Sequence, residues 1–147
     1  MRRIAWWCAV IAATACSAVA APDVIVPYRV AGDAIHKPLA ALPGDAARGR
    51  DIVMGREANC LLCHAAAETG ARFMGNIGPP LSGVGARLFA AQLRLRVVDQ
   101  SSLNPETVMP SYYRVDHLVR VAPAYQGRPV LSAQQIEDVV TFLLTLK

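Results

Sequence analysis

The chain has 147 residues, 54% of them hydrophobic, and a formal net charge of +4 at pH 7. Without an N-terminal leader that carries two arginines, 13 basic side chains would face 11 acidic ones, a net charge of +2. This balance argues against a nucleic-acid-binding protein, and after residue 20 no segment reaches the roughly 20 apolar residues of a bilayer span without a charge or a Pro/Gly break.

Residues 1–20 have the pattern of an export signal. Two arginines precede an uncharged apolar stretch over residues 4–19, and residues 18–20 read Ala-Val-Ala, a typical cleavage site. We therefore expect a cleaved signal peptide and a periplasmic mature protein of 127 residues, about one domain, with no membrane span. An uncleaved membrane anchor and a lipoprotein processed at Cys16 are the alternatives.

The mature chain begins with an expected extended arm over residues 21–43, where prolines and Gly32 interrupt any helical period. The main domain then covers residues 44–147. Asp45 can accept hydrogen bonds from a first helical turn, which predicts a helix from about Asp45 to Gly55.

Residues 65–85 are rich in glycine and proline and predict a long loop, which in a small domain usually has a function. Apolar residues at three- and four-residue spacing then predict a helix over residues 88–98, with Arg94 and Arg96 on its solvent side. Residues 101–110 read as a second loop. Ser132 and Gln135 form a capping box before a last apolar helix face. No segment has a strand pattern, so the predicted fold is all-α.

Cys60, Cys63 and His64 form a C-x-x-C-H motif, the signature of covalent c-type haem attachment. Two thiols three positions apart on a helical turn can reach the two vinyl groups on one porphyrin edge, and the next imidazole then points at the iron. Both cysteines are consumed by thioether formation. A zinc site, a thioredoxin-like dithiol and a simple disulfide are the alternatives for these residues.

The candidates for the sixth iron ligand are Met54, Met74, Met109, His36 and His117. Met54 and Met74 lie too close to the motif in sequence to reach the opposite haem face. Met109 lies beyond a helix that can carry the chain across, in a loop stiffened by Pro105 and Pro110. We expect His64 and Met109 to be the axial ligands; the alternative for any methionine is that it fills the core.

The loop after the motif suggests supporting roles. The Pro79 carbonyl can accept a hydrogen bond from His64 Nδ1, and Gly83 and Gly85 can bring backbone close to the porphyrin. Arg87 can pair with a haem propionate, although a solvated arginine explains it equally well.

On these residues the chain resembles class I cytochromes c and, within them, the SoxX family, the monohaem subunits of the SoxAX cytochromes of sulfur oxidation. The wider resemblance rests on the helix opening at residues 44–49, with Gly49 where the C-terminal helix crosses closely, the Gly-Pro-x-Leu at residues 78–81, the Met109 loop and residues 131–147. The closer resemblance rests on residues 31–42, 76–84, 93–99, 104–113, 120–123 and 127–131.

The resemblance implies the class I cytochrome c fold with an extended N-terminal arm, one haem c per chain and a heterodimer with a SoxA-like subunit. SoxA is expected to join thiosulfate to a cysteine of the SoxYZ carrier, an L-cysteine S-thiosulfotransferase reaction. This chain would then relay the released electrons to a cytochrome acceptor, with no substrate site of its own.

A diffusible monohaem electron carrier without a permanent partner is the main alternative, and a haem-based gas sensor is a third. A stable subunit should hide an apolar patch. The arm around Val24, Ile25, Val26 and Tyr28, or Tyr112 and Tyr113 beside the Met109 loop, could supply one. For the two tyrosines, packing in the haem pocket is an equal alternative.

Overall fold

The computed structural model describes residues 25–147, so the predicted signal peptide lies outside the described residues. The described part of the chain contains four α-helices: α1 (Ala46–Met54), α2 (Val84–Arg87), α3 (Ala90–Asp99) and α4 (Ala133–Thr145). Short 3₁₀ helices span Cys60–Leu62, Ala67–Thr69, Gln100–Ser102 and Pro123–Tyr125. Across the described part of the chain there is no strand, only an isolated bridge between Ala31 and Ala34. The predicted all-α fold is confirmed.

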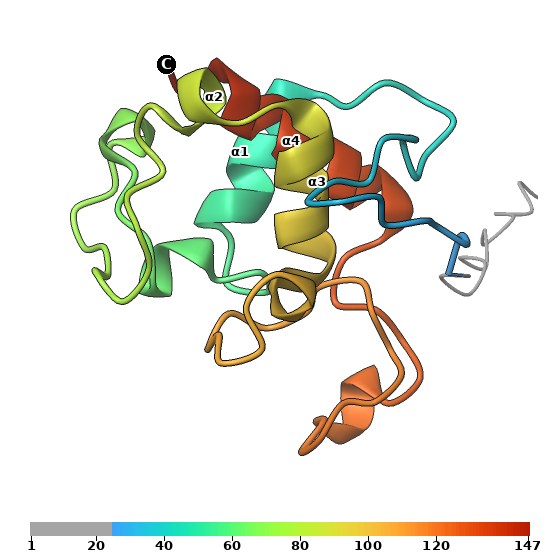
Figure 1. Ribbon diagram of the computed structural model, residues 1–147. Helices are drawn as coiled ribbons and strands as arrows, with labels where there is room; N and C mark the ends of the chain where they lie inside the picture. Colours follow the sequence, from blue (N-terminus) through green and yellow to red (C-terminus); the bar gives the residue numbers. More distant parts are fainter. Residues whose placement is uncertain (1–24) are drawn as a thin grey trace, which may run out of the picture.

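The frame of the molecule is the crossing of α1 with α4, two helices from opposite ends of the domain (Figure 1). Asp45 caps α1 by accepting from the backbone N–H of Arg48, as predicted. Ser132 and Gln135 form the predicted capping box of α4. A side chain at Gly49 would overlap the carbonyl of Asp138, so glycine is what allows the two helices to approach so closely.

The α1–α4 crossing is also stabilised by an ion pair and by a hydrogen bond from the backbone. Arg48 donates to both carboxylate oxygens of Asp138, each at 2.8 Å, and the backbone N–H of Asp45 donates to the same side chain at 2.8 Å. Burial alone would raise the pKa of Asp138, but these bonds and one from Gln134 outweigh it and lower the pKa.

The helix predicted over residues 88–98 is α3, and the short helix α2 precedes it, where the long loop was expected to end. The turn α2 is followed by α3, which packs against α4. A side chain at Gly85 would overlap the carbonyls of Leu143 and Leu144, and the Gly85 N–H donates to the Leu146 carbonyl at 2.9 Å. The position requires glycine because the end of α4 lies against it.

The prediction that Arg94 faces solvent is wrong. Its side chain is only 5% exposed and forms a bidentate ion pair with Glu137 of α4, at 2.7 and 2.8 Å. Arg94 Nη1 also donates to the Ile35 carbonyl, and the Leu39 N–H donates to Glu137. The periodicity of one helix cannot reveal this, because the partners come from α4 and the arm.

The expected arm is therefore part of the core. Residues 25–43 have no helix, yet Ile35 and Leu39 are buried. The Val26 N–H donates to the hydroxyl of Tyr113 at 2.8 Å, and the rings of Tyr28 and Tyr113 pack 6.2 Å apart. Tyr112 and Tyr113 are both buried, so neither forms a surface patch. Tyr112 lines an internal cavity, as the packing alternative predicts, whereas Tyr113 packs against the arm.

Candidate functional site

A cavity of ≈ 670 Å³ opens between the loop after residue 59 and the segment after α3. This volume lies within the roughly 300–1,000 Å³ of pockets that bury small molecules and cofactors. Its walls are mainly apolar side chains, namely Ile77, Leu81, Val84, Leu88, Leu93, Val97, Val108 and Leu143. An apolar wall of this extent suits a large flat hydrophobic group.

Cys60, Cys63 and His64 all line this cavity. A 3₁₀ turn over Cys60–Leu62 holds them, since the N–H groups of Cys63 and His64 both donate to the Cys60 carbonyl. Cys60 and Cys63 do not form a disulfide with each other. Burial raises the pKa of the Cys60 thiol to about 11, which describes a neutral group in an apolar wall and not an activated nucleophile.

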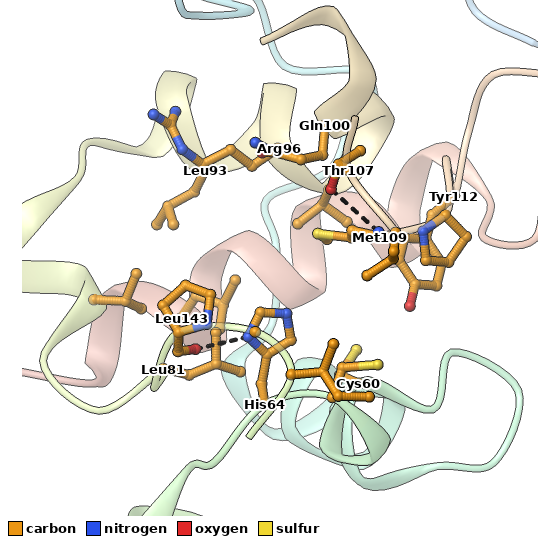
Figure 2. Close-up of a pocket in the computed structure, with 18 of the residues that line it drawn as sticks. Cys60, His64, Leu81, Leu93, Arg96, Gln100, Thr107, Met109, Tyr112 and Leu143 are labelled. Atoms are coloured by element: carbon orange, nitrogen blue, oxygen red, sulfur yellow. Dashed lines mark hydrogen bonds between the residues drawn. The ribbon is translucent and has the colours of Figure 1, made fainter. Parts of the chain in front are cut away.

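The orientation of His64 is set by the loop that follows it. Nδ1 lies 2.7 Å from the Pro79 carbonyl oxygen (Figure 2). This bond makes Nδ1 the protonated nitrogen and leaves Nε2 available as a metal ligand. A side chain at Gly78 would overlap the imidazole ring, so the backbone itself forms one side of the cradle around His64.

Met109 lines the cavity from the opposite side. Figure 2 shows its side chain facing the cavity across from His64. The Met109 N–H donates to the hydroxyl of Thr107 at 3.2 Å, a local bond within the loop. Tyr112, three residues further on, closes this part of the wall and donates its hydroxyl to the Ala58 carbonyl at 2.7 Å.

The other candidate ligands lie elsewhere. Met54 is exposed near the end of α1, and the Met74 sulfur accepts a contact from the Ala66 N–H at 3.1 Å. His36 is exposed, and the His117 side chain is 87% exposed beside Asp116. None of these four side chains lines the cavity.

Arg87 lies at the rim of the cavity, where its guanidinium donates to the carbonyls of Ser82 and Pro80 at 2.8 and 3.0 Å. It thus supports the turn that holds Pro79. Gly83 and Gly85 do not line the cavity: Gly83 adopts a left-handed backbone beside Arg87, and Gly85 faces α4. The expectation that these two glycines approach the porphyrin is wrong, and Gly78 has the corresponding position beside His64.

Arg96 is a cavity residue that the sequence prediction missed. It was expected on the solvent side of its helix, but its half-buried side chain reaches the cavity wall and lies 3.9 Å from Asp33. Its guanidinium also donates to the Gln92 carbonyl one turn earlier. A single amphipathic helix offers no signal for this, because the cavity is formed by a loop from another part of the chain.

The donor set tests what the cavity can hold. In residues 25–147, no group of three or more His, Cys, Asp or Glu side chains could hold a metal ion, so the ligands of a zinc site are not assembled there. Two thiols, one oriented imidazole and one thioether converge instead on an apolar cavity. This set fits a covalently attached haem.

Comparison with known proteins agrees with this chemistry. The model of the family described as Cytochrome c matches residues 46–147. A chain of the crystal structure of SoxXA from P. pantotrophus is 37% identical, with a TM-score of 0.76 over 82% of this chain and 94% of that chain. No sequence among the curated proteins matched. Within residues 25–147, none of the helices is long and apolar enough to span a bilayer.

Proposed function

The chain belongs to the cytochrome c family, and from this premise we propose that it is the monohaem electron-relay subunit of a periplasmic SoxAX-type complex. The observation that carries this proposal is the 37% identity, over 82% of the chain, to a chain of the SoxXA structure. At this identity the similarity concerns more than a shared fold. Residues 1–20 would be the signal that exports it, residues 21–43 the arm and residues 44–147 the cytochrome domain.

We assign Cys60 and Cys63 as the attachment points of one haem c, and His64 and Met109 as the axial iron ligands. When bound, the haem supplies a one-electron couple at its iron. The Pro79 carbonyl holds His64 in the protonation state that can bind iron. The apolar wall would limit the access of water, and a thioether ligand such as that of Met109 would favour reduced iron, which suits an electron acceptor.

The relay role follows from what the described residues can and cannot do. Within residues 25–147 the only cysteines are Cys60 and Cys63, and both lie on the cavity wall. Once they are bound to haem, this part of the chain has no thiol that could hold a sulfur substrate. We infer that a SoxA-like partner carries out the thiosulfate chemistry with the SoxYZ carrier, and that this chain passes the electrons to a cytochrome acceptor.

The ligand assignment is tested by Met109→Ala. Haem attachment should persist, because it depends on Cys60 and Cys63, but the weak long-wavelength absorption of ferric iron bound to a thioether should disappear. Met74→Ala is the matched control, since this methionine lies outside the cavity. If the absorption survives in Met109→Ala, another residue binds the iron.

The relay is tested by reconstitution. The purified chain alone should show no haem reduction by thiosulfate, and adding a SoxA-like subunit with SoxYZ should produce it. The two cytochrome subunits should co-elute in gel filtration, which implies an interface above about 1,000 Å². Reduction of the lone chain at a comparable rate would refute the relay, whereas a free monomer in the presence of SoxA would favour the diffusible carrier.

A further inference from the structure

Asp99 lies at a junction that the haem site does not explain. It is the last residue of α3 and caps the following 3₁₀ helix, Gln100–Ser102, by accepting from the Ser101 N–H. Its side chain is only 6% exposed. A negative charge at a helix C-terminus is disfavoured by the helix dipole, and its burial is costly unless donors surround it. A carboxylate at this position is therefore costly unless nearby groups donate hydrogen bonds to it.

The donors to Asp99 come from both ends of one segment. From the start of the segment, the hydroxyls of Ser101 and Ser102 donate at 2.6 and 2.8 Å. From its end, the Ser111 hydroxyl donates at 2.5 Å. Beyond the segment, Arg114 Nε lies 3.4 Å from the carboxylate, as an ion pair without a hydrogen bond. One carboxylate thus joins the two ends of residues 100–111, closing them into a loop.

This loop carries Met109 and has few other attachments. In the described structure, the hydrogen bonds of residues 103–110 all stay within residues 100–109. Beyond Asp99, the loop returns to α3 through two backbone bonds, from Tyr112 and Tyr113 to the last turn of α3, and these are long at 3.4 and 3.3 Å. Short bonds to a carboxylate are stronger than long neutral ones.

We propose that Asp99 is a positioning residue that joins the ends of the Met109 loop and so holds the thioether in the cavity. This inference rests on the proposed role of Met109 as an iron ligand. A thioether is a weak ligand, and it stays bound only while the loop stays closed. Asp99 lowers the fraction of molecules in which the loop opens and exposes the iron position to competing ligands.

The test compares Asp99→Asn and Ser111→Ala with Asp138→Asn in the haem-loaded ferric protein. Asp138 is a matched control, because it too is a buried carboxylate bound by an arginine, but it fastens α1 to α4 and makes no bond to the Met109 loop. Each protein is titrated with imidazole, which competes for the position of the thioether. Amide hydrogen exchange of a peptide over residues 100–113 is measured in parallel.

We expect Asp99→Asn to bind imidazole at least about tenfold more tightly than wild type, because loss of hydrogen bonds to a charged group shifts the open fraction by about that factor. Ser111→Ala should give a smaller change in the same direction. Exchange should rise within residues 100–113 in both variants. Asp138→Asn should keep the wild-type imidazole affinity even where its melting temperature falls.

Equal imidazole affinity in Asp99→Asn, Ser111→Ala and the Asp138 control would overturn the proposal. If Asp99→Asn does not fold, the imidazole affinity of Ser111→Ala compared with that of Asp138→Asn decides the proposal. A failure of the underlying ligand assignment looks different: the thioether absorption would survive in Met109→Ala, which would remove the premise and overturn the positioning role as well.

Discussion

The two walls of the haem cavity are held in different ways. The wall that carries His64 is fixed by main-chain hydrogen bonds between distant parts of one loop, from Gly75 to Leu61, Gly78 to Cys63 and Leu81 to Ala65, at 2.7–2.8 Å. The wall that carries Met109 depends on side chains, chiefly Asp99 with its serine donors and the hydroxyl of Tyr112.

This difference predicts where each wall is sensitive. Backbone bonds survive most side-chain replacements, so apart from Arg87, which supports the turn at Pro79, the His64 wall should be most sensitive where a new Cβ has no room, as at Gly78. The Met109 wall should respond to single polar substitutions. We therefore expect the Met109 side of the cavity to be the more adjustable one and the His64 side to be the more constant one.

The largest effect should come from Cys60→Ser combined with Cys63→Ser. Without these thiols the haem that both walls enclose would not be attached. The cavity of ≈ 670 Å³ would be left in the centre of a small domain, and the apolar contacts of the haem would be lost. We expect the helical circular dichroism to collapse. A double mutant that stays helical and monomeric would show that the two walls hold together without haem.

Gly78→Ala should break the His64 wall. The added methyl group would overlap the imidazole ring, which costs about 1–3 kcal/mol of stability and moves the ring away from the Pro79 carbonyl. Gly70→Ala is the control, since there only a left-handed backbone is penalised and no atom lies within 4 Å. The visible spectrum should change in Gly78→Ala alone. An unchanged spectrum in both variants would contradict the claim that the backbone at Gly78 holds the His64 ring in place.

Tyr112→Phe should loosen the connection between the walls. The Tyr112 hydroxyl bonds to the Ala58 carbonyl, which precedes the haem motif. Removing it leaves a buried carbonyl without this partner, at a cost of about 1–3 kcal/mol. Chemical unfolding measures the loss. Tyr125→Phe, at a half-buried residue of a 3₁₀ turn outside the cavity, should have almost no effect.

The smallest effect should appear as a pH dependence of stability through Asp99. Burial alone would raise the pKa of Asp99, but hydrogen bonds from Ser101, Ser111 and Ser102 and the charge of Arg114 lower it. A lowered folded-state pKa stabilises the protein above the unfolded value of about 3.9, and this contribution is lost as the pH falls through the folded value.

The stability difference between wild type and Asp99→Asn should therefore be constant from neutral pH to about pH 4 and shrink below it. Urea unfolding over this pH range measures the difference. A gap that stays constant down to the most acidic conditions would contradict a lowered pKa for Asp99.

Much of the architecture could be predicted from the sequence because it depends on local signals. Asp45, Ser132 and Gln135 begin their helices where capping chemistry predicts. The C-x-x-C-H motif is local too, so its three residues were expected together. Met109 could be singled out from five candidates because chain length and prolines limit which of them reaches the far wall.

The errors share one cause, which is contact between distant segments. Arg94 reads as a surface residue of its own helix, yet Glu137 and the arm enclose it. Gly85 reads as part of a haem loop, yet the end of α4 is what requires it. Asp99 gives no signal of its role, because its donor Ser111 lies twelve residues away across the Met109 loop.

The α1–α4 crossing has a consequence for the order of events during biogenesis. The bond from Asp45 to Asp138 joins residues 93 positions apart, and contacts at such separation form late because the chain must first lose the entropy of closing a large loop. We expect the segment around Cys60 to remain accessible until the last helix docks, which leaves an interval in which the thiols can be modified. Pulsed thiol labelling during refolding would reveal that interval as reactivity that ends when α4 becomes protected.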